Sequence, residues 1–286
     1  MDILEKHINF YDDWKPAYYR VQEKRFLHTV PFIKNYSAVS EELSLLSDQV
    51  GTATHDAFRV KTEKGSALEL GSIGSLFLHY LKHVCHYKNV FGTGVFPGDK
   101  KIDEYFIEND VLCEKYSYKK FNLDFQSELF PCADNFFDFV LCMEVIEHLN
   151  HNPYFLLKEI NRLTRPYGML LLTTPNVNCL GNVKKILTGA IPMVCPEFNI
   201  RNDPSAIHTR EYSIPTLNEF LEHAGFKPVC IKTVNSFSSD TDLKALKDIK
   251  TLITDNGYSI EYRGDNILIL AQKLSLPKSG YPALYV

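Results

Sequence analysis

Acidic and imidazole side chains follow directly after short apolar runs of the sequence. Glu69 ends one such run, Asp124 follows a second, and Glu144 and His148 follow a third. A carboxylate complements positive charge on a ligand, and an imidazole can act as a general base near neutral pH. The pattern therefore indicates a ligand site with room for acid–base chemistry.

These residues need a scaffold that brings the ends of strands together. Residues 65–175 alternate short apolar runs with longer amphipathic stretches, which is typical of a parallel α/β sheet. In open sheets of this kind, ligands bind outside the carboxyl ends of the strands. The segments 69–74, 144–148 and 175–176, and also Asp124, would all lie at that edge.

The apolar runs predict seven strands in an open, doubly wound and mostly parallel sheet. We expect these strands at 67–70, 90–95, 119–123, 137–143, 169–174, 227–233 and 266–273. Helices are expected between them, at 75–83, 152–164, 214–224 and 242–255. Pro166–Gly168 is a stop signal for the second of these helices, and Gly225 is a C-cap for the third.

The first strand ends in a glycine turn that contains Gly71, Ser72 and Gly74. Glycine lets the chain turn sharply and lets a ligand approach main-chain atoms. The helix that follows offers unpaired N–H groups at its N-terminus. An ordinary strand-to-helix turn is the alternative. The turn lacks the third glycine of the dinucleotide-binding pattern, which counts against a nicotinamide oxidoreductase.

Composition excludes several classes of protein. The 286 residues include 31 Lys and Arg against 35 Asp and Glu, a formal net charge of −4, which argues against sequence-independent nucleic-acid binding. No apolar run approaches the roughly 20 residues of a membrane span, and the first residues do not resemble a signal peptide. Seven cysteines without a CxxC pair indicate reduced thiols in the cytoplasm. We expect no metal site and no membrane partner.

The order of four segments resembles the class I S-adenosylmethionine-dependent methyltransferases, in particular their small-molecule group. The segments are Leu68–Gly74, Leu129–Leu149, Arg162–Asn176 and His208–Phe226. The resemblance covers residues 65–176 and 208–273. It implies a Rossmann-like methyltransferase domain at 61–286, with S-adenosyl-L-methionine as cofactor and S-adenosyl-L-homocysteine as product.

The resemblance also implies cofactor-binding residues. The cofactor-binding residues implied in the glycine turn lie under the methionine and ribose parts of the cofactor, and they are Glu69, Gly71, Ser72 and Gly74. Those at the adenine are Asp124, against the amino group, and Phe125, packed on the purine. Those near the methionine amino group and the sulfonium are Glu144 and Val145. The alternatives are that Asp124 caps a turn and that Glu144 caps the next helix.

One departure from the family concerns the ribose. Family members usually end the second strand with an acid, but this chain has Gly94 there. Either Asp99 folds back, or Thr93 and backbone groups hold the ribose, or the cofactor binds more weakly than usual. Asp103 and Glu104 are further candidates.

A second departure is Tyr167, which takes the place of the first glycine in a Pro-Gly-Gly turn. A tyrosine suits a tight turn if its φ is negative. We therefore expect a negative φ at this residue.

The acceptor site is expected between the variable parts of the chain. These are a helical cap at 1–60 and an insertion at about 176–212 with one short helix. The candidate general bases are His148 and His208; the alternatives are that His148 only packs and that Arg210 pairs with Glu211. The candidate substrate-binding residues are Tyr18, Arg20, Asn176, Arg210 and Tyr212.

The sequence leaves several functions open. The first is a small-molecule methyltransferase, acting most simply on a hydroxyl of a sugar, a nucleotide-linked sugar or a secondary metabolite; N- and C-methylation are variants of it. The second is a cofactor-binding protein of the same fold without catalysis, which the missing acid at Gly94 motivates. Nucleic-acid methylation lacks both a base pocket and a basic stripe. The expected assembly is a monomer or a homodimer.

Overall fold

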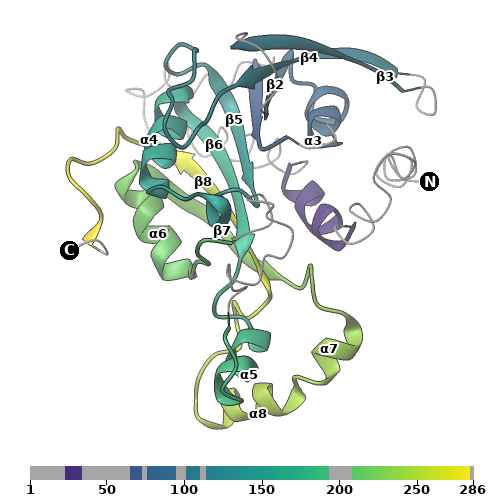
Figure 1. Cartoon of the computed structure of the whole chain (residues 1–286), viewed down its shortest axis with the longest axis vertical. Helices are drawn as coiled ribbons and strands as arrows, with labels where there is room; N and C mark the ends of the chain where they lie inside the picture. Colours follow the sequence, from purple (N-terminus) through teal and green to yellow (C-terminus); the bar gives the residue numbers. More distant parts are fainter. Residues whose placement is uncertain are drawn as a thin grey trace, which may run out of the picture.

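The computed structural model describes residues 23–33, 65–72, 76–94, 101–109, 114–192 and 208–283. Strands of this part form one sheet at the centre of the molecule (Figure 1). They are β1 (Ser66–Leu70), β2 (Asn89–Gly94), β3 (Ile102–Asn109), β4 (Glu114–Asn122), β5 (Phe137–Met143), β6 (Thr164–Pro175), β7 (Phe226–Val234) and β8 (Asn266–Lys273). Their order in the sheet is β3-β4-β2-β1-β5-β6-β8-β7.

The middle of the sheet is parallel and its edges are antiparallel. β1 pairs in parallel with β2 and β5, β2 with β4, and β5 with β6. β8 runs antiparallel to β6 and β7, and β3 runs antiparallel to β4. Every residue of β1 is buried, as expected for a strand covered on both faces. The predicted mostly parallel, doubly wound sheet is confirmed.

Helices cover both faces of this sheet. They are α3 (Leu76–His79), which continues as a π-helix (Tyr80–Val84), α4 (Pro153–Leu163), α5 (Leu180–Leu187), α6 (Ile214–His223), α7 (Asp240–Lys244) and α8 (Lys247–Asp255). Residues 23–33 form a further helix. α4 and α6 contribute to one core cluster, whereas α3 and the helix at 23–33 contribute to a second cluster. A third, smaller cluster joins α5 to α8 away from the sheet (Figure 1).

The sheet has one strand more than the sequence predicted. The unpredicted strand, β3, carries Asp103 and Glu104 opposite Lys120 and Lys119 of β4. Opposite charges on paired strands stabilise such a hairpin. An apolar pattern could not reveal this strand, because its register depends on charge.

The predicted helix at 242–255 is two helices. The hydroxyl of Ser239 and the carboxylate of Asp242 form a capping box, so α7 begins earlier than expected. Between the two helices, Leu246 leaves the helical conformation and is buried against Leu180 and Ile253. The interruption between α7 and α8 therefore coincides with the burial of Leu246.

The expected negative φ of Tyr167 is wrong, because its φ is 62°. Tyr167 lies inside β6, at an irregularity where the register against β5 shifts between Phe137 and Phe139. A Cβ on the neighbouring Gly168 would lie within 3.0 Å of main-chain oxygens of Arg165 and Asp138. The bulge thus places Tyr167 in the left-handed region and requires glycine beside it.

The variable regions are described only in part. The helix at 23–33 belongs to the expected cap, and α5 is the short helix expected in the insertion. Residues 1–22, 34–64 and 193–207 lie outside the described part. Within the described part, no helix combines the length and the apolar character that crossing a membrane would require.

Asp138 ties together the beginnings of three strands, and we expect Asp138→Ala to lower the free energy of unfolding by about 2–3 kcal/mol. Its Oδ2 accepts hydrogen bonds of 2.8 Å from the main-chain N–H groups of Gly65 and Ser66, and its Oδ1 pairs with Arg165. Urea denaturation measures the loss. Asp255→Ala, at the exposed end of α8, is the control and should change it by less than about 0.5 kcal/mol. Equal stability of both variants would contradict this role.

Candidate functional site

A large cleft opens at the carboxyl edge of the sheet. Its volume is about 1230 Å³, above the usual 300–1,000 Å³ of a pocket for one small molecule. The cleft-lining residues that the sequence predicted as site residues are Gly71, Phe125, Glu144, Val145, His148, Asn176 and His208. The structure therefore brings together groups from five separate segments of the chain.

The turn after β1 is held by the end of β2. The main-chain N–H of Gly71 donates to Oγ1 of Thr93 at 2.7 Å, and the hydroxyl of Ser72 donates to the carbonyl of Thr93 at 2.9 Å. Thr93 is fully buried. Thr93 and Ser72 thus shape the turn, and of its described residues only Gly71 reaches the cleft. Gly71 has a φ of 63°, which explains the need for glycine.

Glu69 is a buried carboxyl between two cations. Burial raises its pKa to about 8, while the charges of Arg25 and Lys120 oppose this rise. Its Oε2 accepts no hydrogen bond from the described residues. A buried acceptor without a donor is costly for a folded chain, and Glu69 lies behind the residues that line the cleft.

A lysine of β4 lies beside the end of β2, where members of the resembled family usually have an acid. A Cβ on Gly94 would lie 2.2 Å from Cε of Lys120 and 2.5 Å from its Nζ. The lysine side chain therefore fills the space that an acidic side chain at this position would need. Burial lowers the pKa of Lys120, and the nearby Glu69 opposes this change.

Glu144 is fixed by two neighbouring strands. Its Oε1 accepts hydrogen bonds from the hydroxyl of Thr173 at 2.7 Å and from Nδ2 of Asn266 at 2.8 Å. The residue has a φ of 54°, a conformation that non-glycine residues adopt rarely and mainly where function or packing demands it. These contacts leave Glu144 at the cleft wall rather than in a helix cap.

Asp124 caps its own turn, one of the two interpretations that the sequence left open. Its carboxylate accepts hydrogen bonds from the N–H of Gln126 and the hydroxyl of Ser127. Asp124 is exposed, whereas Phe125 lines the cleft. Gln126 in turn accepts a 2.7 Å hydrogen bond from the N–H of Asn150. The turn is thereby tied to the segment after β5.

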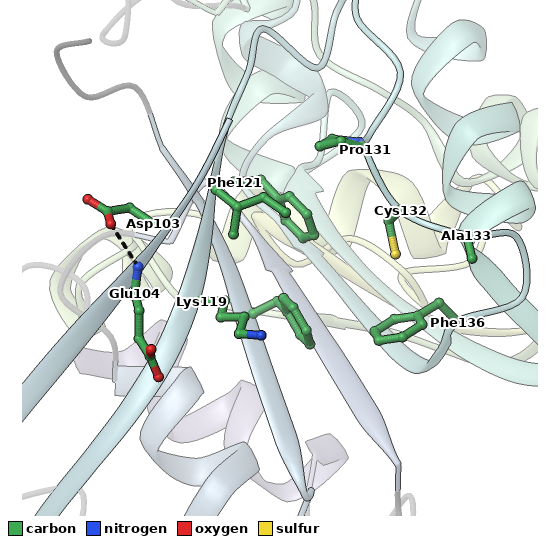
Figure 2. A pocket seen from close by; sticks show the side chains of 10 residues that line it. Asp103, Glu104, Lys119, Phe121, Pro131, Cys132, Ala133 and Phe136 are labelled. Carbon is green, nitrogen blue, oxygen red and sulfur yellow. Dashed lines mark hydrogen bonds between the residues drawn. The ribbon is translucent and has the colours of Figure 1, made fainter. Parts of the chain in front are cut away.

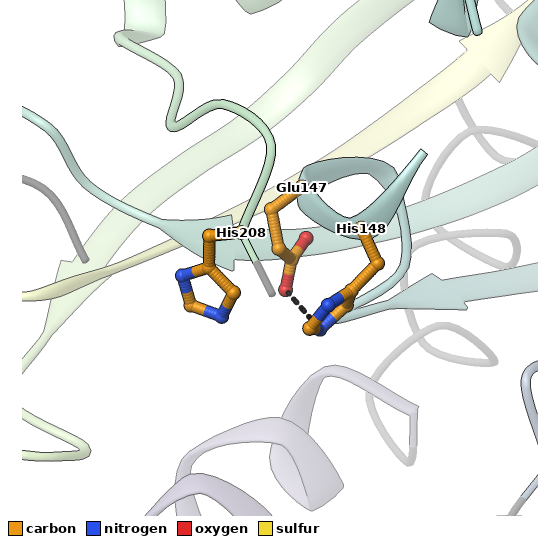
Figure 3. A group of neighbouring side chains, drawn as sticks. All are labelled: Glu147, His148 and His208. Carbon is orange, nitrogen blue, oxygen red and sulfur yellow. Dashed lines mark ion pairs between the residues drawn. The ribbon is translucent and has the colours of Figure 1, made fainter. Parts of the chain in front are cut away.

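A buried carboxylate and two imidazoles meet in the cleft, as Figure 3 shows. Glu147 and His148 belong to a 3-10 helix (Ile146–His148), and His208 precedes α6. Oε2 of Glu147 accepts a 2.9 Å hydrogen bond from Thr174, and its Oε1 lies 3.8 Å from Nε2 of His148. Burial, followed by the charge of Glu144, raises the pKa of Glu147 well above its usual range.

His208 lies beside His148, and the two rings meet edge to face with centroids 4.9 Å apart. Nδ1 of His208 contacts Oε1 of Glu211 at 3.4 Å. Glu211 also accepts a hydrogen bond from Asn182. The contacts of Glu211 are thus with His208 and Asn182, rather than the ion pair with Arg210 that the sequence left open.

The predicted substrate-binding residues differ in their surroundings. Nδ2 of Asn176 donates to the carbonyls of Tyr262 and Gly264, so this residue lines the cleft but holds the chain. Tyr212 is 2% exposed and donates its hydroxyl to the carbonyl of Ile146. Arg210 is half-buried next to this segment. The predicted site residues outside the described part are Tyr18, Arg20, Gly74 and Asp99.

Several residues of the site escaped the sequence analysis. Arg25 comes from the helix at 23–33 and Asp242 from α7, and both line the cleft. No pattern in the sequence marks either of them. Glu147 could have been predicted from the sequence, because it immediately precedes His148 in the segment 144–148 at the carboxyl edge of the sheet.

A second cavity of about 480 Å³ lies away from these groups, between β4 and the segment before β5 (Figure 2). Its wall includes the aromatic rings of Phe91, Phe121 and Phe136. Asp103 and Glu104, the further ribose candidates, line this cavity. The structure thus places these two acids beside the smaller cavity.

Comparison with known proteins identifies the domain. The profile of a family described as "Methyltransferase domain" matches residues 44–231. A comparison with curated protein sequences found no match.

Three solved structures share low sequence identity with this chain. A SAM-dependent methyltransferase from Archaeoglobus fulgidus is 17% identical, with a TM-score of 0.46 over 82% of this chain and 94% of that one. An S-adenosylmethionine-dependent methyltransferase from Mesorhizobium loti is 13% identical, with a TM-score of 0.43 over 78% of this chain and 98% of that one. Phosphoethanolamine N-methyltransferase 2 from Haemonchus contortus, in complex with S-adenosyl-L-methionine, is 13% identical. Its TM-score is 0.44 over 78% of this chain and 52% of that one.

Glu69 should make the stability of the protein depend on pH. The pKa of Glu69 is about 8 in the folded protein, against 4.5 without burial. The contribution of Glu69 to the free energy of unfolding is therefore complete below pH 4.5 and is lost as the pH rises to 8. Glu69→Gln should remove this component, whose slope is at most about 1.4 kcal/mol per pH unit. Urea denaturation between pH 5 and 8 measures it, with the exposed Glu222→Gln as the control. Parallel curves for wild type and Glu69→Gln would refute the assignment.

Proposed function

Because the chain belongs to the methyltransferase domain family, we propose that it transfers a methyl group from S-adenosyl-L-methionine to a small-molecule acceptor. The observation that carries this proposal is the continuity of one cleft. Gly71, Glu144 and Val145 line the same space as His148 and His208. A cofactor at the first group of residues would thus adjoin an acceptor at the second.

Two features of the cleft fit the proposed cofactor. The buried Oε2 of Glu69 lacks a donor among the described residues, and the hydroxyl groups of a ribose are donors. A Cβ added to Gly71 would lie 3.2 Å from Val145, in the gap between the turn after β1 and the segment after β5. Glu69, Gly71, Glu144 and Val145 would hold the ribose and methionine parts, and Phe125 would pack on the purine. When bound, the cofactor supplies an activated methyl group on a sulfonium.

The chain's own residues would align the acceptor and handle its proton. Val145 and Leu149 exclude water from part of the cleft wall, which favours displacement at a charged sulfonium. His148 and His208 are placed to accept a proton from an acceptor hydroxyl. We therefore propose O-methylation, with a sugar, a nucleotide-linked sugar or a secondary metabolite as acceptor. Lys184 and Lys185, at the far wall, would favour an acceptor with negative charge.

A second candidate function follows from Lys120. A lysine beside Gly94 weakens the case for a tightly held ribose, so a cofactor-binding protein without turnover is the alternative. Calorimetry with S-adenosyl-L-methionine tests both functions, and formation of S-adenosyl-L-homocysteine with sugars, phenols or amines separates them.

Gly71→Val should weaken binding of S-adenosyl-L-methionine at least tenfold, because a branched Cβ would enter the approach to the main chain. Isothermal titration calorimetry measures the dissociation constant. Gly257→Val is a matched control, since Gly257 also has a positive φ (76°) but no atom within 4 Å of its added Cβ. It should bind the cofactor like the wild type. Equal affinities of all three proteins would remove the β1 turn from the cofactor site.

His148→Ala and His208→Ala should reveal the general base. Loss of a positioned base lowers turnover about 10²–10⁴-fold, and cofactor affinity should stay within a few-fold of wild type. Initial rates of S-adenosyl-L-homocysteine formation and calorimetry measure the two quantities. Unchanged turnover in both variants would exclude a histidine base.

A further inference from the structure

We propose that Glu147, His148 and His208 form a binding site for a divalent transition-metal ion of the zinc type. Spacing along the chain does not predict a metal, because His208 lies 60 positions after His148 and the three residues show no familiar ligand pattern. The site itself stands on the geometry of the three side chains. Its part in catalysis rests on the proposed methyl transfer.

The three side chains already lie close enough to share an ion. One ligand atom from each lies within 4.8 Å of the other two. Bonds of about 2.0–2.1 Å to zinc place tetrahedral ligands roughly 3.4 Å apart. Small side-chain rotations would therefore close the site around an ion (Figure 3).

The backbone holds the two contributing segments in register. The N–H of Thr209 donates to the carbonyl of Glu147 at 2.8 Å, and its hydroxyl donates to the carbonyl of Leu149 at 2.6 Å. Thr209 directly follows His208. His208 is thus fixed against the 3-10 helix that carries the other two ligands.

The state of Glu147 is the independent sign of a missing partner. The residue is fully buried, and Oε1 accepts no hydrogen bond from the described residues. Nε2 of His148 lies 3.8 Å from this oxygen, which is too long for a hydrogen bond. A buried carboxylate oxygen without a donor is costly, and a bound cation would satisfy it.

A second carboxylate orients one of the imidazoles. Oε1 of Glu211 lies 3.4 Å from Nδ1 of His208, and Nδ2 of Asn182 donates to Oε2 of Glu211. Metal-binding histidines commonly donate their other ring nitrogen to a carboxylate. This contact would leave Nε2 of His208 for the ion.

The ligand set indicates both the ion and its use. Two imidazoles and one carboxylate suit zinc and its neighbours better than magnesium or calcium, which prefer oxygen ligands. Three protein ligands leave an open position toward the cleft. With both imidazoles bound to the ion, neither would act as the free base of the metal-free chain, and a hydroxyl oxygen at the open position would instead lose its proton to solvent more easily. As its bond to the methyl carbon forms, the carbon–sulfur bond breaks and its electron pair stays on sulfur.

Titration of the metal-free full chain with ZnCl₂ alone tests the site. Calorimetry should show one Zn²⁺ per chain, and CoCl₂ should give the visible absorption of a four- or five-coordinate Co²⁺ ion. MgCl₂ should bind at least tenfold more weakly. Absence of stoichiometric binding of both Zn²⁺ and Co²⁺ would overturn the proposal.

Variants then locate the ion. Glu147→Gln and His208→Ala should each weaken Zn²⁺ binding at least tenfold and change the Co²⁺ spectrum. The exposed His151→Ala is the control and should bind like the wild type. If Glu147→Gln fails to fold, His208→Ala alone decides, since His208 precedes α6 and is partly exposed. Unchanged binding by His208→Ala would place the ion elsewhere and overturn the proposal.

The two proposals can fail separately. Calorimetry with S-adenosyl-L-methionine on the metal-free chain reports the cofactor site alone. Cofactor binding without Zn²⁺ binding would refute only the metal site, and Zn²⁺ binding without cofactor binding would refute only the proposed function.

Discussion

The parallel register of β1, β5 and β6 is the constraint on which the cleft depends. Leu70 pairs with Cys142, and Met143 pairs with Thr173, so the three strands end at the same level. Parallel strands must end at one edge, and the side chains that follow them are necessarily neighbours. Glu144 illustrates this, because its carboxylate is fixed by a hydroxyl from β6 and an amide from β8.

Two buried carboxyls at this edge oppose the stability of the fold. Glu69 and Glu147 are both removed from water, and each has one oxygen without a hydrogen-bond donor in the described part of the chain. Burial of an acid raises its pKa and costs free energy. An acid kept in such surroundings at the wall of a cleft, as Glu147 is, is typical of a binding or catalytic site rather than of a core optimised for stability.

The far wall of the cleft is built by helices that lie outside the sheet. α5 and α8 pack together through Leu180, Leu246 and Ile253, away from the sheet. Asp265 connects this region to the sheet, since its carboxylate accepts hydrogen bonds from the N–H groups of Ser236 and Ser238. The edge of the sheet and these helices thus form different walls of the same cleft.

The sequence by itself determined the doubly wound sheet and the edge where the cleft opens. Apolar runs such as Phe137–Met143 and the glycine at 71 are local signals, and local signals are readable from order alone. The tertiary structure decided what surrounds them. Arg25 beside Glu69, Lys120 against Gly94, and His208 beside Glu147 are contacts between residues far apart in the chain. Register and packing create such contacts, and no spacing in the sequence encodes them.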